Sequence, residues 1–345
     1  MLQKAPTDMF PTDIAVNLKD VTKTFTQWQR DNTGKGILKN LIKPEKRIIK
    51  ALDQVSFSIG KGEFVAYAGP NGAGKSTTMK LLCGMLLPNE GRITVLNRSP
   101  IKDRIPLMQN LGILFGNRTE LWWDHPVIQS FKWKKVVWNI PDDVYERNLS
   151  RVIELLDLEG ILKTFARELS LGQRMRADLG LLLLHSPQLL LLDEPTLGLD
   201  VVAKRQMIEF LKRLNREDGV TIVVTSHDMD DLEEMAQRIL MISNGHVAYD
   251  GSFQGLRNVT GNLTRVNLTM GGGTIPKLPQ TTHCHLLSAS HEVYEYEIDL
   301  DKTPIEALMG QLSQLKGLRD IEIKKAPIEQ VIAQLYKEWK SSECV

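Results

Sequence analysis

The chain has 345 residues, a hydrophobic content of 42% and a formal net charge of +1. This length suits about two domains and allows a large buried core. A net charge near zero excludes a global field that would recruit nucleic acid or an anionic surface. The cysteines, Cys83, Cys284 and Cys344, lack a paired spacing, which argues against a disulfide framework or a zinc site and suits a reducing compartment.

Sorting signals are not evident in the sequence. The first six residues have no basic flank followed by an apolar core, so we expect no signal peptide. The most apolar runs, residues 179–184 and 189–192, are too short to cross a bilayer, which takes about 20 residues. Cys344 is one residue from the C-terminus, so the prenylation pattern is not met. We therefore expect a chain that stays in the cytoplasm.

The chain begins with two strand-like segments, residues 14–18 and 21–25, followed by an insertion of about residues 26–50. Within the insertion, four apolar residues fall at helical spacing beside many lysines, which predicts a short basic amphipathic helix that Pro44 ends. Such a helix could lie on an anionic lipid surface or a membrane partner. Equally, it could be a solvated surface insertion with its apolar side on the domain. The sequence leaves both alternatives open.

A complete phosphate loop of the form GxxxxGKS/T follows the next strand. It reads Gly69, Pro70, Asn71, Gly72, Ala73, Gly74, Lys75, Ser76, Thr77. The apolar run 64–68 predicts a buried strand before the loop, and residues 77–82 predict a helix after it. In such a loop the backbone N–H groups and the helix N-terminus face phosphate oxygens. We expect Lys75 to reach the β- and γ-phosphates and Ser76 to bind Mg²⁺, so the sequence predicts a nucleotide site.

Further strands are predicted at residues 91–96 and 111–115, after which the sequence becomes helical and rich in aromatic residues from about 119 to 175. Four tryptophans fall in this segment: Trp122, Trp123, Trp133 and Trp138. We expect most of them to be core residues of a helical subdomain. The alternative is a contact surface for a partner, because aromatic residues concentrate binding energy.

Two later strands end in residues suited to nucleotide hydrolysis. Leucines at 189–192 lead into Asp193 and Glu194, as expected for a central parallel strand that delivers acids at its C-terminal edge. Mg²⁺ prefers oxygen ligands, which fits Ser76 with Asp193, and a second carboxylate at Glu194 can deprotonate the attacking water. The strand at 220–224 leads to His227, which could stabilise the γ-phosphate or could merely cap a turn.

The segment Leu169, Ser170, Leu171, Gly172, Gln173 resembles the signature motif of the ATP-binding subunits of ABC transporters. The resemblance implies an α/β fold of the P-loop NTPase, ABC-type class, with a mixed sheet core and a helical signature subdomain. It implies that Ser170, Gly172 and Gln173 contact the γ-phosphate of ATP held by a second subunit. A helix N-terminus with a serine hydroxyl is a suitable anion site. Leu171 stands where the family usually has glycine.

Other positions are assigned only by this resemblance. Asp200 resembles the D-loop aspartate that couples two sites across a dimer, and His227 resembles the switch histidine. Phe25 matches the aromatic residue that stacks on adenine. At the Q-loop, where the family has glutamine, this chain has Asn117, which keeps an amide on a side chain one methylene shorter.

The resemblance covers about residues 14–251 and predicts an ABC ATP-binding domain at 1–255. Residues 256–345 predict a small C-terminal α+β domain for dimerisation or regulation, with a strand at 293–298, a helix at 304–315, a strand at 321–323 and a final helix at 328–339. His283, Cys284 and His285 suggest a metal, but on a strand Cys284 faces away from both histidines, so we expect no zinc there.

The insertion after Phe25, the segment 121–124 and the signature resemble a bacterial branch that serves ABC-2 type permeases, related to export subunits. The implied function is an ATPase with ATP and Mg²⁺ as cofactors, which works at the cytoplasmic face of the inner membrane. Its expected partners are an integral membrane permease and a second ATP-binding subunit, identical or different. The alternative is a soluble ABC ATPase acting on ribosomes or DNA. Such proteins usually carry two nucleotide-binding domains or a long coiled coil, and neutral charge argues against nucleic acid.

Overall fold

The computed structural model describes residues 13–29, 45–116, 119–259, 263–271, 284–300 and 302–325. The chain divides into two compact units, Met1–Asp250 and Gly251–Val345. Each unit is described by itself. In the described ranges, no helix is both long and apolar enough to span a bilayer.

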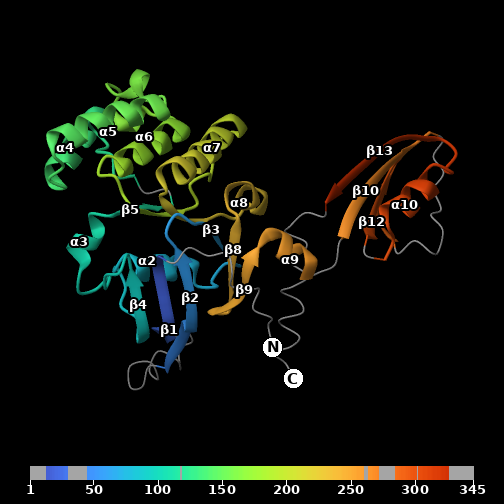
Figure 1. The fold of residues 1–345 in the computed structure, drawn as a ribbon, viewed down its shortest axis with the longest axis horizontal. Helices are drawn as coiled ribbons and strands as arrows, with labels where there is room; N and C mark the ends of the chain where they lie inside the picture. Colours follow the sequence, from blue (N-terminus) through green and yellow to red (C-terminus); the bar gives the residue numbers. More distant parts are fainter. Residues whose placement is uncertain are drawn as a thin grey trace, which may run out of the picture. The chain divides into compact units, whose positions relative to one another are not determined.

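A six-stranded sheet in the first unit has the order β5-β6-β7-β3-β8-β9 (Figure 1). Its strands are β3 (Phe64–Ala68), β5 (Leu111–Phe115), β6 (Leu189–Asp193), β7 (Thr221–Thr225), β8 (Arg238–Ser243) and β9 (His246–Ser252). The pairs β5–β6, β6–β7, β7–β3 and β3–β8 are parallel. Every residue of β3 and β7 is buried, as expected for parallel strands covered on both faces. The parallel order brings the carboxyl ends of β3, β6 and β7 to one edge.

The second sheet of this unit is antiparallel and has the order β2-β1-β4. It consists of β1 (Ile14–Gln29), β2 (Glu45–Gly60) and β4 (Glu90–Val95). Strands β1 and β2 extend further into the segment 26–50 than the sequence predicts, because the cross-strand pairing continues past Phe25↔Ile49 to Gln29↔Glu45. The amphipathic helix predicted around residues 37–43 lies outside the described residues.

One hydrophobic core joins both sheets to helix α2 (Lys75–Leu82). Leu52 and Ile59 of β2 are fully buried, as is Val65 of β3, and Leu81 of α2 is 1% exposed. Each side chain of this kind stabilises the fold by about 1.5–3 kcal/mol when fully buried. The phosphate loop between β3 and α2 is therefore anchored at both of its ends.

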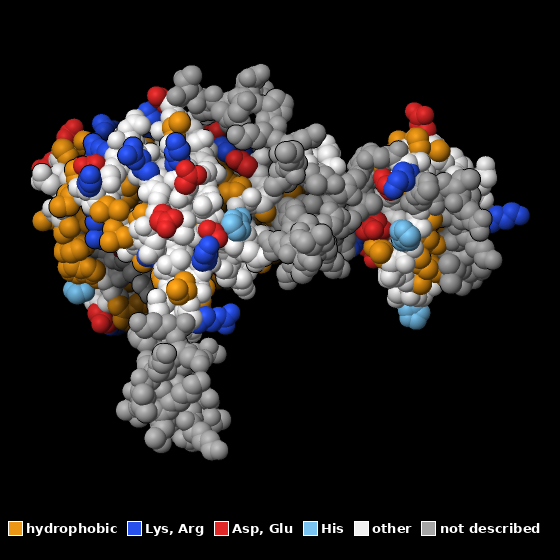
Figure 2. All heavy atoms as spheres, turned by 90° about the horizontal axis from the view of Figure 1, so that it is seen from below, with side chains coloured by type: hydrophobic (Ala, Val, Ile, Leu, Met, Phe, Trp, Pro, Cys, Tyr) orange, Lys and Arg blue, Asp and Glu red, His pale blue; other side chains and the backbone are white. Residues whose placement is uncertain are grey.

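Helices α4 (Val127–Val137), α5 (Asp142–Leu155), α6 (Leu171–Leu183) and α7 (Val201–Asp218) form a separate layer on one side of the six-stranded sheet (Figure 1). Helix α3 (Arg104–Met108) lies apart from this layer, and α8 (Met229–Met235) follows β7 in the chain. In Figure 2, hydrophobic side chains gather on the side of the larger unit where α3 and α4 lie.

The prediction that most tryptophans of this layer are core residues is wrong. Trp122, Trp123 and Trp133 are 37%, 51% and 42% exposed, and Trp138 is half-buried. Trp122 instead packs at the surface against Trp133 and His125, with ring centroids 5.1 and 5.2 Å apart. The backbone N–H of Trp122 donates a hydrogen bond of 2.9 Å to the hydroxyl of Ser130, which is buried.

The second unit contains a four-stranded antiparallel sheet with the order β11-β12-β10-β13. Its strands are β10 (Leu263–Met270), β11 (Cys284–Ser290), β12 (Val293–Asp299) and β13 (Leu318–Lys325). Helix α10 (Ile305–Leu312) packs on one face, where Leu308 and Leu312 join Val266, Tyr296 and other inward side chains. A short helix α9 (Phe253–Val259) precedes this sheet in the chain.

The predicted strand at 293–298, helix at 304–315 and strand at 321–323 are confirmed, and the strand assumed at Cys284 is the start of β11, whereas β10 was not predicted. The final helix predicted at 328–339 lies outside the described residues, and so does His283. Cys284 and His285 lie on β11, and the described residues contain no group of three or more His, Cys, Asp or Glu side chains placed to hold a metal ion.

Candidate nucleotide-binding site

The phosphate loop leads directly from the end of β3 to the start of α2, and no other helix or strand lies between them. The helix begins at Lys75, two residues earlier than the sequence predicts. Gly72 and Gly74 have φ angles of 81° and 113°, which favour glycine. At Gly74 a Cβ atom would lie 2.6 Å from the carbonyl oxygen of Ala51 and 2.7 Å from Leu52. Only glycine allows β2 to approach the loop this closely.

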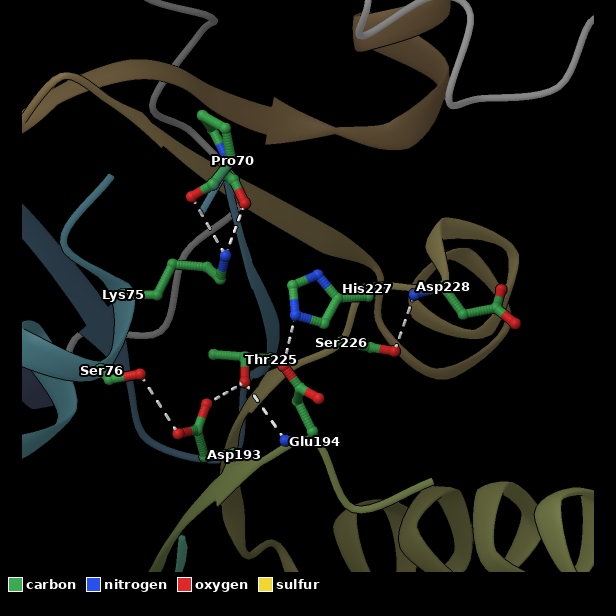
Figure 3. A network of polar contacts seen from close by, with 10 residues as sticks. Pro70, Lys75, Ser76, Asp193, Glu194, Thr225, Ser226, His227 and Asp228 are labelled. Carbon is green, nitrogen blue, oxygen red and sulfur yellow. Dashed lines mark hydrogen bonds and ion pairs between the residues drawn. The ribbon is translucent and has the colours of Figure 1, made fainter. Parts of the chain in front are cut away.

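Lys75 lies at the centre of the loop (Figure 3). Its ammonium group donates hydrogen bonds to the carbonyl oxygens of Gly69 at 2.6 Å and Pro70 at 3.3 Å. Burial lowers the pKa of Lys75, while the carboxylates of Glu194 and Asp193 act in the opposite direction. The charge is held inside the loop, where an anionic ligand would meet it.

Asp193 ends β6 and joins two neighbouring elements (Figure 3). One carboxylate oxygen accepts a hydrogen bond of 2.5 Å from the Thr225 hydroxyl at the end of β7. The other accepts a hydrogen bond of 3.3 Å from the hydroxyl of Ser76 in α2. The Ser76 and Asp193 oxygens converge on one point and suit a hard cation such as Mg²⁺. The residues present therefore fit the metal that the sequence suggests.

Glu194 leaves the strand in a left-handed conformation, with φ of 58°. Its N–H donates to the carbonyl oxygen of Thr225 at 3.0 Å and meets the Thr225 hydroxyl at 3.2 Å. Its carboxylate lies 2.7 Å from the Nε2 atom of His227. A non-glycine residue in this region of φ and ψ is strained by about 1–3 kcal/mol, and such strain is common at functional sites. The turn directs the carboxylate of Glu194 away from the strand and towards the phosphate loop.

These residues line one cavity of about 220 Å³. Its walls are formed by Ala51, Pro70, Asn71, Gly72, Gly74, Lys75, Ser76, Thr77, Asp193, Glu194 and His227. Sequence reasoning did not identify two contributors, Ala51 and Thr225. Thr225 is the last residue of β7 and lies directly opposite Asp193, the last residue of β6. A hydroxyl residue at the end of the neighbouring strand was therefore the sequence signal that could have identified this contact.

The signature residues lie at the start of α6, apart from this cavity. Ser170 caps the helix, and its hydroxyl accepts a hydrogen bond of 3.2 Å from the Gln173 N–H. The Gln173 side chain accepts one of 3.0 Å from the Ser170 N–H. This reciprocal pair is a capping box. Ser170, Gly172 and Gln173 do not line the phosphate-loop cavity.

The signature and the D-loop position contact each other within the chain. A Cβ atom at Gly198 would lie 2.7 Å from the Leu171 side chain, and one at Gly172 would lie 3.4 Å from Ala203. Asp200 caps α7, and its carboxylate accepts a hydrogen bond of 2.8 Å from the Ala203 N–H. The leucine that replaces the usual glycine therefore packs on the segment between Glu194 and Asp200.

Of the two remaining predicted residues, Phe25 and Asn117, the structure describes only Phe25. Phe25 lies on β1 with 39% of its surface exposed and with the Lys23 ammonium 5.3 Å from its ring centroid, and it does not line the cavity. Asn117 lies outside the described residues. Gly116, which precedes it, donates a hydrogen bond of 3.0 Å to the Asp193 carbonyl oxygen, so the chain leaves β5 beside the end of β6.

The fold and the cavity together define a P-loop nucleotide-binding domain. Residues 52–197 match the model of the ABC transporter family. This match and the fold show that the first unit has the P-loop fold of ABC-type ATPases.

Known proteins support this identification. The chain is 29% identical to the ABC transporter ATP-binding protein NatA of Bacillus subtilis over 212 residues, which cover 61% of this chain and 86% of NatA. It is 32% identical to the methionine import ATP-binding protein MetN of Carboxydothermus hydrogenoformans, over 62% of this chain and 65% of MetN. The chain spans only about two fifths of the length of the first curated relatives it matches, at 34–35% identity.

A solved structure of the ATP-binding cassette MJ0796, a dimer in a post-hydrolysis state bound to ADP and Pi, aligns with a TM-score of 0.57. Its sequence is 26% identical, and the alignment covers 69% of this chain and 98% of that chain. The structure of another ATP-binding subunit of an ABC transporter, 22% identical with a TM-score of 0.58, supports the fold alone.

Proposed function

We propose that this chain is the ATP-hydrolysing subunit of an ABC transporter, which dimerises on ATP and drives a separate membrane permease. One observation carries the proposal. Lys75, Asp193, Glu194 and His227 line a cavity of about 220 Å³ beside the phosphate loop, while Ser170 caps a helix outside that cavity. The site gains its signature residues only from a second ATP-binding subunit, identical or different.

The site residues take separate roles in hydrolysis. Lys75 and the backbone N–H groups between Asn71 and Thr77 hold the phosphates, and Glu194 deprotonates the attacking water. His227, 2.7 Å from Glu194, orients the carboxylate and stabilises the γ-phosphate. Ser76 and Asp193 would hold Mg²⁺, which neutralises charge on the phosphates. Asp200 couples the two sites, and Phe25 offers an exposed ring on which adenine stacks.

The Mg²⁺ assignment has a test that does not depend on turnover. Binding of Mg²⁺ with a non-hydrolysable ATP analogue should raise the thermal midpoint of the wild-type chain above that obtained with the analogue alone. Asp193→Asn should remove this additional increase. An equal increase in both proteins would assign the metal elsewhere.

The permease is expected to dock where the sheet core meets the helical layer, near Asn117, Trp122 and Trp123. A groove of about 670 Å³ lies between α3 and the end of α4, and it is a second candidate for the docking surface. Its wall includes Ile105 and Val137, which are 77% and 50% exposed. Exposed apolar side chains gathered in this way mark interaction surfaces (Figure 2). The chain would thus work at the cytoplasmic face of the membrane.

Export is the proposed direction, because the segment after Phe25, residues 121–124 and the signature resemble export-type subunits. The C-terminal unit is proposed to support dimerisation or regulation. Relatives named for import, such as MetN, share the nucleotide-binding domain, so that domain alone does not set the direction.

Co-purification tests the function. The chain is expressed with a six-helix membrane protein encoded beside its gene, and the detergent-extracted membrane protein is used as bait. We expect the chain to co-purify and its ATPase rate to rise with the permease present. Isolation of the chain without a membrane partner, with an ATPase rate indifferent to any permease, would contradict the transporter assignment.

A further inference from the structure

The two residues proposed for hydrolysis, Glu194 and His227, lie on loops at the ends of two different strands. Glu194 follows β6 and His227 follows β7. The His227 side chain is 53% exposed and Glu194 is strained, so neither is fixed by packing alone. Their 2.7 Å contact therefore depends on how the two loops are held.

Lys204, in the first turn of α7, connects both loops. Its ammonium group lies 2.7 Å from a carboxylate oxygen of Asp228 and 3.0 Å from one of Asp231. The Lys204 N–H also donates to the carbonyl oxygen of Asp200, so Lys204 stands one helical turn after the D-loop position. The two carboxylates raise the pKa of Lys204, which keeps the side chain charged.

On the β7 side, Asp228 immediately follows His227. Its N–H donates a hydrogen bond of 3.0 Å to the Ser226 hydroxyl (Figure 3). Its carboxylate accepts one of 3.1 Å from the Asp231 N–H. Both bonds close the turn that presents the imidazole. The ion pair with Lys204 fixes the same carboxylate to α7.

On the β6 side, the contact runs through Thr196, two residues after Glu194. The buried Thr196 hydroxyl donates a hydrogen bond of 3.0 Å to Asp231, in the same carboxylate that Lys204 contacts. The Asp231 side chain is only 8% exposed. Loss of its cation would leave a buried carboxylate without charge compensation, which is a strong reason for the loop to move.

We infer that Lys204 is a positioning residue for ATP hydrolysis: it joins the loops of Glu194 and His227 through Asp228 and Asp231, and sets their geometry from the start of α7. The inference depends on the proposed ATPase function. If Lys204 has this role, a change in position at Asp200 would be passed to Glu194 and His227 through the segment from Asp200 to Lys204. Small displacements of positioned groups reduce rates by up to about a hundredfold.

The test uses the full chain and three variants, with ATPase kinetics, binding of a non-hydrolysable ATP analogue and thermal midpoints measured for each. Lys204→Met keeps an apolar stem without the charge, Lys204→Arg keeps the charge, and Lys212→Met makes the same change two turns later on α7, where Lys212 contacts Glu209 of its own helix. For Lys204→Met we expect kcat to fall about tenfold or more, with KM and analogue affinity within about twofold of the wild type.

Recovery of most of the lost kcat by Lys204→Arg, with Lys212→Met close to the wild type, would support the inference. A Lys204→Met variant that melts earlier but keeps the wild-type kcat below its midpoint would show a purely structural ion pair and overturn it. An equal loss in Lys204→Met and Lys212→Met would also overturn it.

If the wild-type chain does not hydrolyse ATP, the proposed function itself fails, which is a different result from failure of this inference. If Lys204→Met does not fold, the kcat of Thr196→Val decides, because this change removes the hydrogen bond between the loop of Glu194 and Asp231. An unchanged kcat in Thr196→Val would overturn the inference.

Discussion

The phosphate loop and the signature segment differ in how each is held. The site at the phosphate loop is built from the ends of three strands, β3, β6 and β7. Its polar groups contact residues far away in the sequence: Ser76 contacts Asp193, and Asp193 contacts Thr225. The signature is one helix end whose polar groups bond to each other within three residues. The first arrangement is fixed by contacts between distant strands, whereas the polar groups of the second are satisfied within their own helix end.

This difference matters for the chemistry of the signature. The Ser170 hydroxyl accepts the Gln173 N–H, which leaves its own O–H available to donate to an incoming phosphate. The cap and the phosphate contact therefore do not compete. A single chain should bind ATP through the phosphate loop, and only a pair of subunits should hydrolyse it.

Glu194→Gln should give the largest effect. The amide preserves size and the contact with His227 but cannot accept the proton of the attacking water, so turnover should fall by about a hundredfold or more. ATP binding should persist, and the ATP-bound dimer should accumulate. Phosphate release and light scattering with Mg-ATP measure the two outcomes. Hydrolysis at the wild-type rate would remove Glu194 from its role as base.

Ser170→Ala should reduce ATP hydrolysis, which needs the signature, without changing ATP binding, which needs only the phosphate loop. Hydrolysis should fall about tenfold to a hundredfold, because a hydroxyl donor to the phosphate is lost, while ATP affinity of the single chain stays unchanged. Loss of the cap should also reduce the free energy of unfolding by about 1 kcal/mol.

Ser170→Asp serves as the matched control for the cap. Aspartate caps a helix as well as serine but donates no hydrogen bond to phosphate and repels it. It should restore the stability lost in Ser170→Ala without restoring hydrolysis. Recovery of the ATPase rate by Ser170→Asp would mean that the serine acts only as a cap.

The same contrast explains how much could be predicted from the sequence. The strands at 64–68 and 111–115, the loop at 69–77 and the acidic end of β6 follow from local patterns, and the structure places them as predicted. The capping pair at Ser170 is also local. These features depend on residues within a few positions of each other, which a sequence displays directly.

The contacts that could not be predicted from the sequence are those between neighbouring strands of a sheet and between a strand and the loop that it passes. Thr225 holds Asp193 because β7 lies beside β6, and Ala51 reaches the cavity because β2 passes Gly74. Neither neighbour follows from spacing along the chain. The exposed tryptophans were misassigned for a related reason: burial of Trp122 and Trp133 depends on what packs around them rather than on their hydrophobicity.

Asp178 offers a prediction on how α6, the signature helix, is anchored. This buried carboxylate accepts hydrogen bonds from the Thr119 hydroxyl at 2.8 Å and the Glu120 N–H at 3.0 Å. Burial raises its pKa to about 6. The folded protein therefore binds this proton more tightly than the unfolded chain, and the free energy of unfolding should fall as pH rises from about 4 to 6 and then level.

Asp178→Asn keeps a carbonyl oxygen that can accept both hydrogen bonds but cannot ionise. Its free energy of unfolding relative to the wild type should increase by about 2–3 kcal/mol between pH 4 and pH 7, as measured by urea titrations at several pH values. Glu159→Gln, at an exposed side chain, is the control and should leave the pH dependence nearly unchanged. Parallel pH profiles for Asp178→Asn and the wild type would contradict the raised pKa.

Leu171→Gly should give the smallest effect, because it restores the glycine usual in the family while removing the contact between the signature and Gly198. The lost packing and the extra backbone freedom should reduce the free energy of unfolding by about 1–2 kcal/mol. The ATPase rate should stay within about threefold of the wild type, since Ser170 and Gln173 keep their mutual hydrogen bonds. A loss of hydrolysis as large as in Ser170→Ala would show that the signature is held in place by Leu171 and is not locally preformed.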